Sequence, residues 1–269
     1  MTYNWTLSIE EALGGLLLPS NSVGGTWFRE TKGDKTITSH MLFALLWCML
    51  LWIITLCLVR ICAVIPLFSS SKRHATADAD AKDLVLFVFL GSGGHTGEML
   101  RLLDHYQKAI IEGATTIHVG YSDEDSLVKF KDKIGAIVSS KQLQVKIEYH
   151  HFKKARDVGS SVAGSVISII ETLITSMTIT YNIKKSMRGK PNLTLLNGPG
   201  TCCIITVWLK LYHLFLWQPS KIVYVESLAR TNRLSLTGKI LYPLADEFVV
   251  QWPDLLPAYP RAKYYGILV

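Results

Sequence analysis

The stretch of sequence that decides the fold is LVLFVFLGSGGHTGEMLRLL, residues 84–103. Its first seven residues are all apolar, which is typical of a strand buried on both faces of a parallel sheet. Four glycines lie within the next seven residues and allow the backbone to turn sharply and to approach a ligand closely. Apolar residues then return at helical spacing. A strand, a glycine-rich loop and a helix start predict an anion site, because the first N–H groups of a helix are unpaired and point into the loop.

The same loop narrows the kind of anion. A P-loop needs Lys and then Ser or Thr after its last glycine, but Gly97 is followed by Glu98. The dinucleotide motif needs a third glycine where Thr96 stands, and its ribose-binding acid would fall near Glu112, before the second strand begins. A nicotinamide or ATP enzyme is therefore disfavoured, and we expect a diphosphate; the alternative is a tight turn that binds nothing. The residues predicted to hold the diphosphate in this loop are Gly91, Ser92, Gly93, Gly94 and Thr96.

Length, charge and cysteine usage bound the architecture. The 269 residues leave room for a membrane anchor and one α/β domain of about 190 residues. The net charge is +7, but Lys and Arg are scattered, which argues against nucleic acid and fits a protein beside anionic lipid. The five cysteines show neither CxxC spacing nor a paired framework, so we expect no zinc site, no disulfide and a reducing compartment.

One uncharged run predicts the anchor. Residues 41–59 contain no charged side chain and, at about 1.5 Å per residue, nearly span the hydrocarbon core of a bilayer. We expect a transmembrane helix at 41–62, with a buried core helix as the alternative. Positive charges on its two sides are about even, so only the cysteine usage favours a cytoplasmic domain after it. The expected order is a short lumenal segment at 1–40, the anchor at 41–62, a polar linker at 63–82 and the domain at 83–269.

Alternating patterns after the anchor predict the fold class. Besides residues 84–90, strand patterns occur at 115–121, 145–149, 192–196, 222–225 and 247–252, and helical patterns separate them. This alternation predicts an α/β fold, a Rossmann-like doubly wound parallel sheet. Ligands of such sheets bind beyond the carboxyl ends of the strands, where a second glycine loop follows the strand at 192–196. Its residues predicted to bind the diphosphate are Asn197, Gly198, Gly200 and Thr201.

Two further segments carry predictions of their own. Residues 158–181 are apolar at helical spacing and predict a long helix packed on the sheet. A second membrane span is the less favoured alternative, because the central Glu171 would cost about 2.5–3.5 kcal/mol in a span. Residues 150–156 are predicted as a solvated basic loop. Its adjacent His150 and His151 have no third ligand spaced with them, so no metal site is expected.

Four segments carry a family resemblance: LGSGGHTGEM at 90–99, NGPGT at 197–201, YVESLAR at 224–230 and QWP at 251–253. In this order and spacing they resemble the asparagine-linked glycosylation protein fourteen family. That family is the membrane-anchoring, acceptor-side subunit of a two-part N-acetylglucosaminyltransferase. The resemblance covers residues 83–269 and implies that the domain is one half of a GT-B glycosyltransferase.

The resemblance also implies a reaction and partners. N-acetylglucosamine would be transferred from UDP-N-acetylglucosamine to dolichol-diphosphate-N-acetylglucosamine on the cytoplasmic face of the endoplasmic reticulum. This chain would hold the lipid acceptor and recruit a soluble UDP-N-acetylglucosamine-binding catalytic subunit, without which it would be inactive. No cofactor and no nucleic acid are implied. A noncatalytic membrane scaffold and a complete single-chain nucleotide-sugar enzyme remain as alternatives.

Within that reaction three side chains have candidate roles. His95 is the candidate catalytic residue, because a neutral imidazole near pH 7 can accept the proton of a sugar hydroxyl. An equal alternative is that it hydrogen-bonds a loop carbonyl or a phosphate. Glu226 and Arg230 are predicted to orient the acceptor or to have a structural role.

The C-terminal tail is predicted to bind the partner. Few residues follow the strand at 247–252, so we expect the nucleotide sugar to be held by another chain. The tail is apolar and aromatic, as the cores of interfaces commonly are, although packing on its own domain is the alternative. The residues predicted to bind the partner are Tyr264, Tyr265, Ile267, Leu268 and Val269.

Overall fold

The computed structural model describes residues 32–68, 83–155 and 162–268. The predicted N-terminal segment up to residue 31, most of the predicted linker (69–82) and Val269 lie outside the described residues. The chain divides into two compact units, residues 1–53 and 54–269.

The uncharged run forms one long helix. Helix α2 spans Lys32–Val64, so it begins before the predicted anchor and ends two residues after it. Its stretch His40–Val64 has 25 residues and is long and apolar enough to cross a membrane. At about 1.5 Å per residue this stretch exceeds the ~30 Å of a hydrocarbon core. Its large apolar side chains are exposed, as expected of side chains that lipid would cover.

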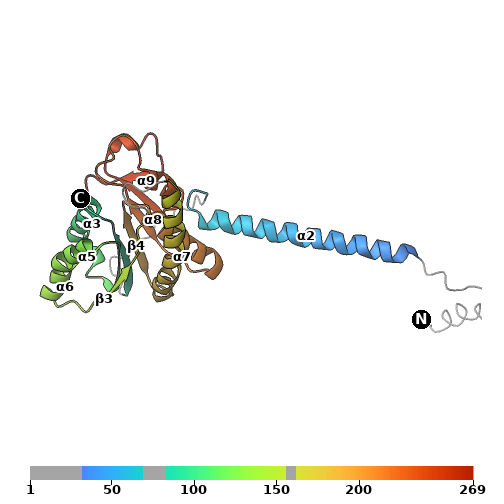
Figure 1. Cartoon of the computed structure of the whole chain (residues 1–269), viewed down its shortest axis with the longest axis horizontal. Coiled ribbons are helices and arrows are strands. Elements are labelled where there is room, and N and C mark those ends of the chain that lie inside the picture. The colour runs from blue at the N-terminus through green and yellow to red at the C-terminus, as the bar shows by residue number, and fades with distance from the viewer. Residues whose placement is uncertain (1–31, 69–82, 156–161, 269) are drawn as a thin grey trace, which may run out of the picture. The chain divides into compact units, whose positions relative to one another are not determined.

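A seven-stranded parallel sheet forms the centre of the second unit (Figure 1). The strand order is β3-β2-β1-β4-β5-β6-β7, so the order reverses between β1 and β4. This confirms the predicted doubly wound sheet. The strands are β1 (Leu84–Leu90), β2 (Ala114–Tyr121), β3 (Lys146–His151), β4 (Asn192–Asn197), β5 (Ile222–Val225), β6 (Glu247–Val250) and β7 (Ala262–Tyr264). The short edge strand β7 was not predicted.

Helices cover both faces of the sheet (Figure 1). One face carries α3 (Gly94–His105), α4 (Gln107–Ile110), α5 (Glu124–Phe130), a π-helical turn (Lys131–Gly135) and α6 (Ala136–Ser140). The other carries α7 (Val162–Ser186), α8 (Thr201–Leu216) and α9 (Leu236–Leu241). A 3₁₀ turn (Pro253–Leu255) precedes β7.

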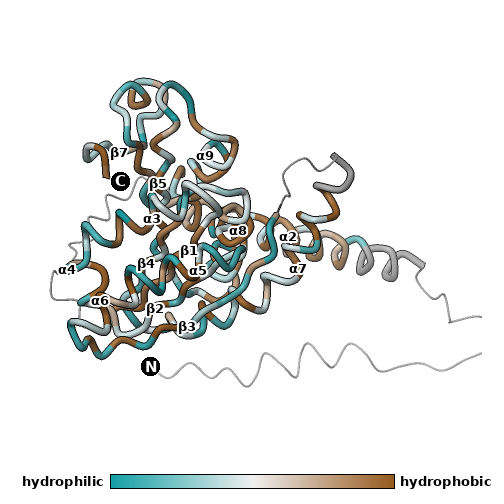
Figure 2. The backbone as a smooth tube through the Cα atoms, turned by 60° about the vertical axis from the view of Figure 1, so that its left-hand side comes forward, coloured by the Kyte–Doolittle hydropathy of each residue, from teal (hydrophilic) through white to brown (hydrophobic). Residues whose placement is uncertain are grey.

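Strand β1 supplies both halves of the core because its side chains alternate between the two faces. Leu86, Val88 and Leu90 pack in the cluster that contains Met99 of α3. Phe87 and Phe89 pack in the cluster beneath α7 and α8. All six side chains from Val85 to Leu90 are at most 1% exposed, which explains the uninterrupted apolar run in the sequence. Figure 2 colours the backbone by residue hydropathy, and hydrophobic residues run along the strands in the interior of the unit.

Helix α7 packs on the sheet as predicted, and its small polar side chains form much of the buried side. Its buried side chains include Thr172, Ser176 and Thr180, and the Thr172 hydroxyl donates to the Lys154 carbonyl oxygen at 3.1 Å. The exposed side carries the apolar residues Val166, Ile167, Ile169, Ile170, Ile174 and Met177. The apolar stripe is therefore free to face lipid or another chain. The stretch Val166–Ser186 is also long and apolar enough to cross a membrane by length and composition.

The predicted basic loop at 150–156 is partly wrong. His150 and His151 belong to β3, because their backbones continue the parallel ladder with Gly120 and Tyr121 of β2. The strand therefore ends two residues later than the alternation of residues 145–149 indicates. Residues 158–161, which open the predicted long helix, lie outside the described residues.

Candidate functional site

Two loops meet where the strand order reverses. The loop after β1 and the loop after β4 are adjacent because β1 and β4 pair in parallel, which makes their carboxyl ends neighbours. A Cβ added to Gly91 would lie 2.7 Å from Cδ of Pro199 and 2.8 Å from Cβ of His95. Gly91 therefore permits a close approach of the two loops that no other residue allows.

The second loop closes on His95 in the same way. Gly198 has a φ of +94°, in the region that favours glycine, and an added Cβ would overlap the His95 ring. By contrast, an added Cβ at Gly200 would meet only Cβ of Ala155, at 3.9 Å. The structure thus brings His95, Gly91 and Gly198 together as predicted and leaves Gly200 exposed at the start of α8.

Both helices at this edge begin without a side-chain cap. Gly93 is the N-cap of α3 and Gly200 is the N-cap of α8, and neither position has a side chain that accepts a helix N–H. Ser92, Gly93 and Gly94 are exposed. The N-terminus of a helix is partly positive and its first N–H groups need partners, so these ends suit an anion.

A hydrogen-bond network fixes the His95 ring. Its Nδ1 lies 3.0 Å from Oδ1 of Asn197 and 3.7 Å from Oε2 of Glu98. Asn197 donates through Nδ2 to Glu98 at 2.9 Å and to the Val225 carbonyl oxygen at 3.1 Å. Because Nδ2 serves both of those acceptors, Oδ1 faces the ring and accepts the Nδ1 proton. Nε2 of neutral His95 then carries the lone pair.

Glu98 is a site residue that sequence reasoning missed. It lies one helical turn after His95, and its Oε1 accepts from the Ser227 hydroxyl at 2.8 Å and from the Leu228 N–H at 3.2 Å. Burial acts to raise the Glu98 pKa, but hydrogen bonds from His95, Asn197 and Ser227 together lower it. The i, i+3 spacing from His95 is the signal that could have found it.

The carboxylate of Glu98 in turn affects His95. The nearby carboxylate is the largest influence on the imidazole and, with Asn197, raises the His95 pKa above 6.5 against the opposing effect of burial. The side chain of His95 remains 34% exposed, so a substrate can reach it. His95 is therefore held in one orientation, accessible, and biased toward its protonated form.

Two predicted ligand residues have buried hydroxyls that serve the chain itself. The Thr96 hydroxyl donates to the Gly91 carbonyl oxygen and lies 2.6 Å from the Ser126 hydroxyl. The Thr201 hydroxyl accepts from the N–H of Ala155 at 3.3 Å. The Thr96 hydroxyl fixes the backbone of its own loop and the Thr201 hydroxyl that of the segment after β3, so both hydroxyls are occupied within the chain.

Glu226 joins the His95 network only through Ser227, whose N–H donates to Oε1 of Glu226 at 3.1 Å and whose hydroxyl donates to Glu98. Glu226 is 1% exposed, and its Oε2 accepts from the N–H and hydroxyl of Ser235, each at 3.1 Å. Burial raises the Glu226 pKa. Ser235 caps α9, so this carboxylate supports the start of that helix. Arg230 is exposed and, among the described residues, forms no ion pair.

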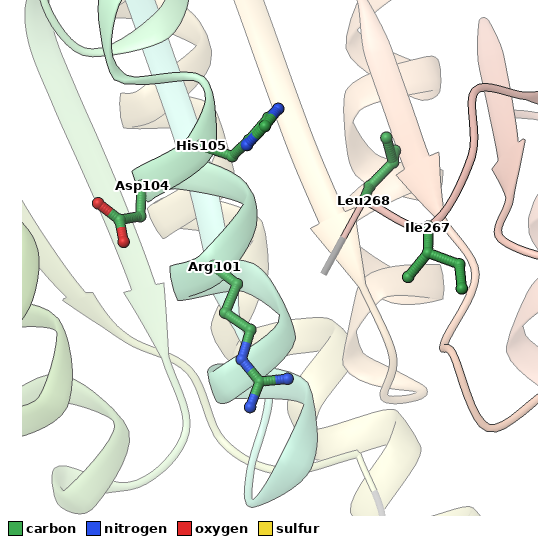
Figure 3. Close-up of a pocket in the computed structure, with 5 residues that line it drawn as sticks. All are labelled: Arg101, Asp104, His105, Ile267 and Leu268. Carbon is green, nitrogen blue, oxygen red and sulfur yellow. The ribbon is translucent and has the colours of Figure 1, made fainter.

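The C-terminal tail lies partly on its own domain. Tyr264 ends β7, and the N–H of Leu268 donates to Oε1 of Gln251 at 3.2 Å. Leu268 also packs with the core cluster beneath α3. Figure 3 shows Ile267 and Leu268 beside α3, where they line an open cavity of about 560 Å³ with Arg101, Asp104 and His105. Tyr265 and Ile267 remain exposed.

The fold and the site define a class of protein before any comparison. A doubly wound parallel sheet with two glycine loops and two uncapped helix ends at its switch point is a Rossmann-like domain whose switch point suits an anionic ligand. A family model described as "Oligosaccharide biosynthesis protein Alg14 like" matches residues 86–268. The chain belongs to this family, which confirms the resemblance found in the sequence.

Relatives of this chain share one name. "UDP-N-acetylglucosamine transferase subunit ALG14" of Kluyveromyces lactis is 70% identical over 236 residues, covering 85% of this chain and 100% of the relative. The protein of that name from Saccharomyces cerevisiae is 52% identical over 191 residues, covering 70% and 78%. The one from Schizosaccharomyces pombe is 39% identical over 183 residues, covering 68% and 82%.

One solved structure aligns at low similarity. The crystal structure of Arabidopsis thaliana UGT89C1 complexed with quercetin has a TM-score of 0.42 and 14% sequence identity, and the alignment covers 70% of this chain and 51% of that chain.

Proposed function

We propose that this chain is the acceptor-side membrane subunit of a UDP-N-acetylglucosamine transferase that builds the dolichol-linked precursor of N-glycans. It adds the second sugar to dolichol-diphosphate-N-acetylglucosamine together with a soluble donor-binding subunit. The observation that carries this proposal is the junction of two uncapped helix N-termini at His95. The names of its relatives as transferase subunits support the same reaction.

In this proposal backbone groups bind the diphosphate of the acceptor. The exposed residues Ser92, Gly93 and Gly94 bring the start of α3 to the ligand, and the two glycines place no side chain in the way. Gly198 and Gly200 bring the start of α8 to the other side. Two partly positive helix ends would balance part of the charge of the diphosphate.

His95 is proposed to remove the proton of the attacking sugar hydroxyl. Asn197 accepts from Nδ1–H, so Nε2 is the atom that takes the proton while the hydroxyl oxygen attacks the anomeric carbon of the donor sugar and UDP leaves. Glu98 stabilises the imidazolium that forms, because its carboxylate lies 3.7 Å from Nδ1. Glu226 and Arg230 are proposed to shape this edge of the site from behind rather than to contact the reacting atoms.

The membrane part of the proposal rests on α2. A dolichol lipid cannot leave the bilayer, so a subunit that holds it gains from an anchor. We propose a single span at residues 41–62, with the N-terminal segment in the lumen of the endoplasmic reticulum and the domain in the cytoplasm. The exposed apolar stripe of α7, with Ile167, Ile170 and Ile174, would then rest in the bilayer interface beside the acceptor.

Reconstitution of the full chain tests the proposed function. The chain is placed in lipid nanodiscs with polyprenyl-diphosphate-N-acetylglucosamine and radiolabelled UDP-N-acetylglucosamine, with or without the donor-binding subunit. We expect labelled lipid only when both chains are present. Transfer by this chain alone would show a complete single-chain enzyme. Unchanged activity when the donor-binding subunit acts on the same lipid without this chain would show a noncatalytic scaffold.

A further inference from the structure

Three metal-ligating side chains gather on the edge of the sheet, outside the site described above. His118 lies in the middle of β2, and Glu148 and His150 lie on β3, the edge strand. The register pairs His118 with Glu148 and Gly120 with His150. Because strand side chains alternate, Glu148 and His150 point to the same face as His118. The ligand atoms of these three side chains all lie within 4.8 Å of one another, close enough to hold one metal ion.

The distances match one triangular face of a tetrahedral site. Nδ1 of His118 lies 3.0 Å from Nε2 of His150 and 3.3 Å from Oε2 of Glu148, and Nε2 of His150 lies 3.9 Å from that oxygen. A tetrahedral Zn²⁺ with bonds of about 2.0–2.2 Å separates its ligand atoms by roughly 3.3–3.6 Å. The His118–Glu148 distance already lies in this range, and each of the other two distances lies within a few tenths of an ångström of it.

A fourth residue, Ser186 at the end of α7, selects the free nitrogen of His118. The Ser186 hydroxyl donates to the Ile183 carbonyl oxygen at 2.7 Å, so it can only accept from Nε2–H of His118, 2.6 Å away. Nδ1 then carries a lone pair that faces the other two ligand atoms. Metal-binding histidines are held in this way by a partner on their other nitrogen.

The lone pair has an electrostatic consequence. Oε2 of Glu148 and Nδ1 of His118 are both electron-rich and lie 3.3 Å apart, an arrangement that a cation between them stabilises. Lys146 pairs with Oε1 of Glu148 at 2.6 Å and so leaves Oε2 for the cluster.

We propose that His118, Glu148 and His150 form a binding site for one Zn²⁺ ion, with water as the fourth ligand. The set of two imidazoles and one carboxylate is typical of zinc that keeps an open position. The side chains of Glu148 and His150 are 33% and 19% exposed, which gives the ion an entry path, whereas His118 is 2% exposed. The ion ties the edge strand β3 to β2, and through Ser186 the site is linked to α7.

This site was not expected from the sequence for a physical reason. The adjacent His150 and His151 drew attention to each other, whereas the pair that shares a face is Glu148 and His150, two residues apart on β3. The third ligand comes from the neighbouring strand through the register of the sheet. His151 is directed to the opposite face and contacts the Tyr121 ring, with centroids 5.4 Å apart, so it serves as the matched control.

Metal titration of the full chain tests the proposal. The chain is purified in detergent without a polyhistidine tag, stripped with a chelator, and titrated with Zn²⁺ against a chromogenic competitor and with Co²⁺ alone. We expect one tight equivalent of Zn²⁺ per chain and the intense visible bands of four-coordinate Co²⁺. Bound Zn²⁺ should also raise the melting temperature, because it binds only the folded state.

Variants assign the ligands. His150→Ala and Glu148→Gln should weaken Zn²⁺ binding by about 100-fold or more, and Ser186→Ala by about 10–100-fold through loss of its support to His118. His151→Ala should bind like the parent chain. The circular dichroism of each stripped variant shows that it is folded. Equal binding by the parent, His150→Ala and Glu148→Gln chains would overturn the proposal, as would a parent chain that retains no zinc.

Discussion

The Nδ1–H of His95 donates to the side-chain oxygen of Asn197 over 3.0 Å, although 102 residues separate the two in the chain. Neighbouring parallel strands β1 and β4 make this contact possible, since Asn197 ends β4 and His95 lies in the first turn of α3, which follows the loop after β1. One amide therefore sets the tautomer of the ring and joins it to Glu98. The relationship gives the site one accessible proton acceptor, Nε2, and it leads to the first prediction.

Removing the imidazole should separate the two proposed roles of His95. His95→Ala should lower kcat by about 10²–10⁴-fold if the ring is the general base. The direction of the pH dependence distinguishes a base from a phosphate ligand. A base must be neutral, so kcat/KM should rise with pH as His95 loses its proton. The midpoint should lie above the usual pKa of 6.5, because Glu98 raises the His95 pKa. Glu98→Gln should move the midpoint to lower pH. A rate that falls over the same range would show that the imidazolium binds phosphate, and a loss under about tenfold in His95→Ala would remove its catalytic role.

A methyl group at the second glycine loop should disturb the same ring. Gly198→Ala forces a residue with a side chain into a φ of +94° and places its Cβ on the His95 ring. We expect activity to fall by at least about tenfold, since strain of this kind costs on the order of 1–3 kcal/mol before the ring moves. Gly200→Ala is the matched control, because its Cβ would meet only Ala155 at 3.9 Å. Assays of both variants at equal expression measure the difference; equal activities would show that the His95 position is not critical.

Charge at the start of α3 should decide acceptor binding. A Cβ at Gly94 would meet no atom within 4 Å, so Gly94→Ala should fold and keep most of the activity. Gly94→Asp adds a negative charge where the diphosphate is proposed to lie and should abolish use of the acceptor. The measurement is KM for the polyprenyl-diphosphate acceptor, with KM for UDP-N-acetylglucosamine as the internal reference. If the Ala and Asp variants behave alike, the diphosphate lies elsewhere.

The topology is tested in sealed microsomes. Protease added outside should digest the α/β domain and spare a tag placed at the N-terminus, because α2 is proposed to cross the membrane once. The Asn4-Trp5-Thr6 sequon should be available for glycosylation in the lumen, whereas the Asn192-Leu193-Thr194 sequon, at the start of β4, should stay unmodified. A protease-resistant domain would overturn this orientation.

How far the sequence predicted the structure depends on whether the signal was local. The run 84–90 and its glycine loop identified β1 and α3 because burial on both faces leaves an apolar pattern within a few residues. The pattern of α7 showed which side is apolar but not which side is buried, and the structure buries the side with Thr172, Ser176 and Thr180. The three-residue strand β7 is too short to show a period.

The site was predicted at the level of its loops and not of its network. The glycines in the sequence located the two loops of the site. They did not show which side chains hydrogen-bond to His95 and Asn197. Glu98 of α3 contacts Ser227 after β5, and His118 of β2 contacts Glu148 of β3; both contacts arise from the tertiary arrangement of the sheet, which no sequence spacing reports. Buried hydroxyls are the converse case, because Thr96 looks like a ligand residue in the motif and proves to support the Gly91 carbonyl oxygen.

The C-terminal tail contains both exposed residues and a residue that packs on its own domain. Tyr265 and Ile267 are 62% and 57% exposed, whereas Leu268 packs on its own core and donates to Gln251. The double variant Tyr265→Ala/Ile267→Ala should therefore lose the donor-binding subunit in co-purification while keeping the parent melting temperature. Leu268→Ala should instead lower the melting temperature.

A matched surface change completes this test. Leu236→Ala/Ile240→Ala removes two exposed apolar side chains of α9, 74% and 44% exposed, and should leave the complex intact unless it too lies in the interface. Deleting residues 264–269 is less informative, because it also removes the end of β7 and the Leu268 contact. Interface cores are rich in aromatic side chains, so we expect Tyr265 to contribute more than Ile267. Full recovery of the complex with Tyr265→Ala/Ile267→Ala would show that the partner docks on another surface.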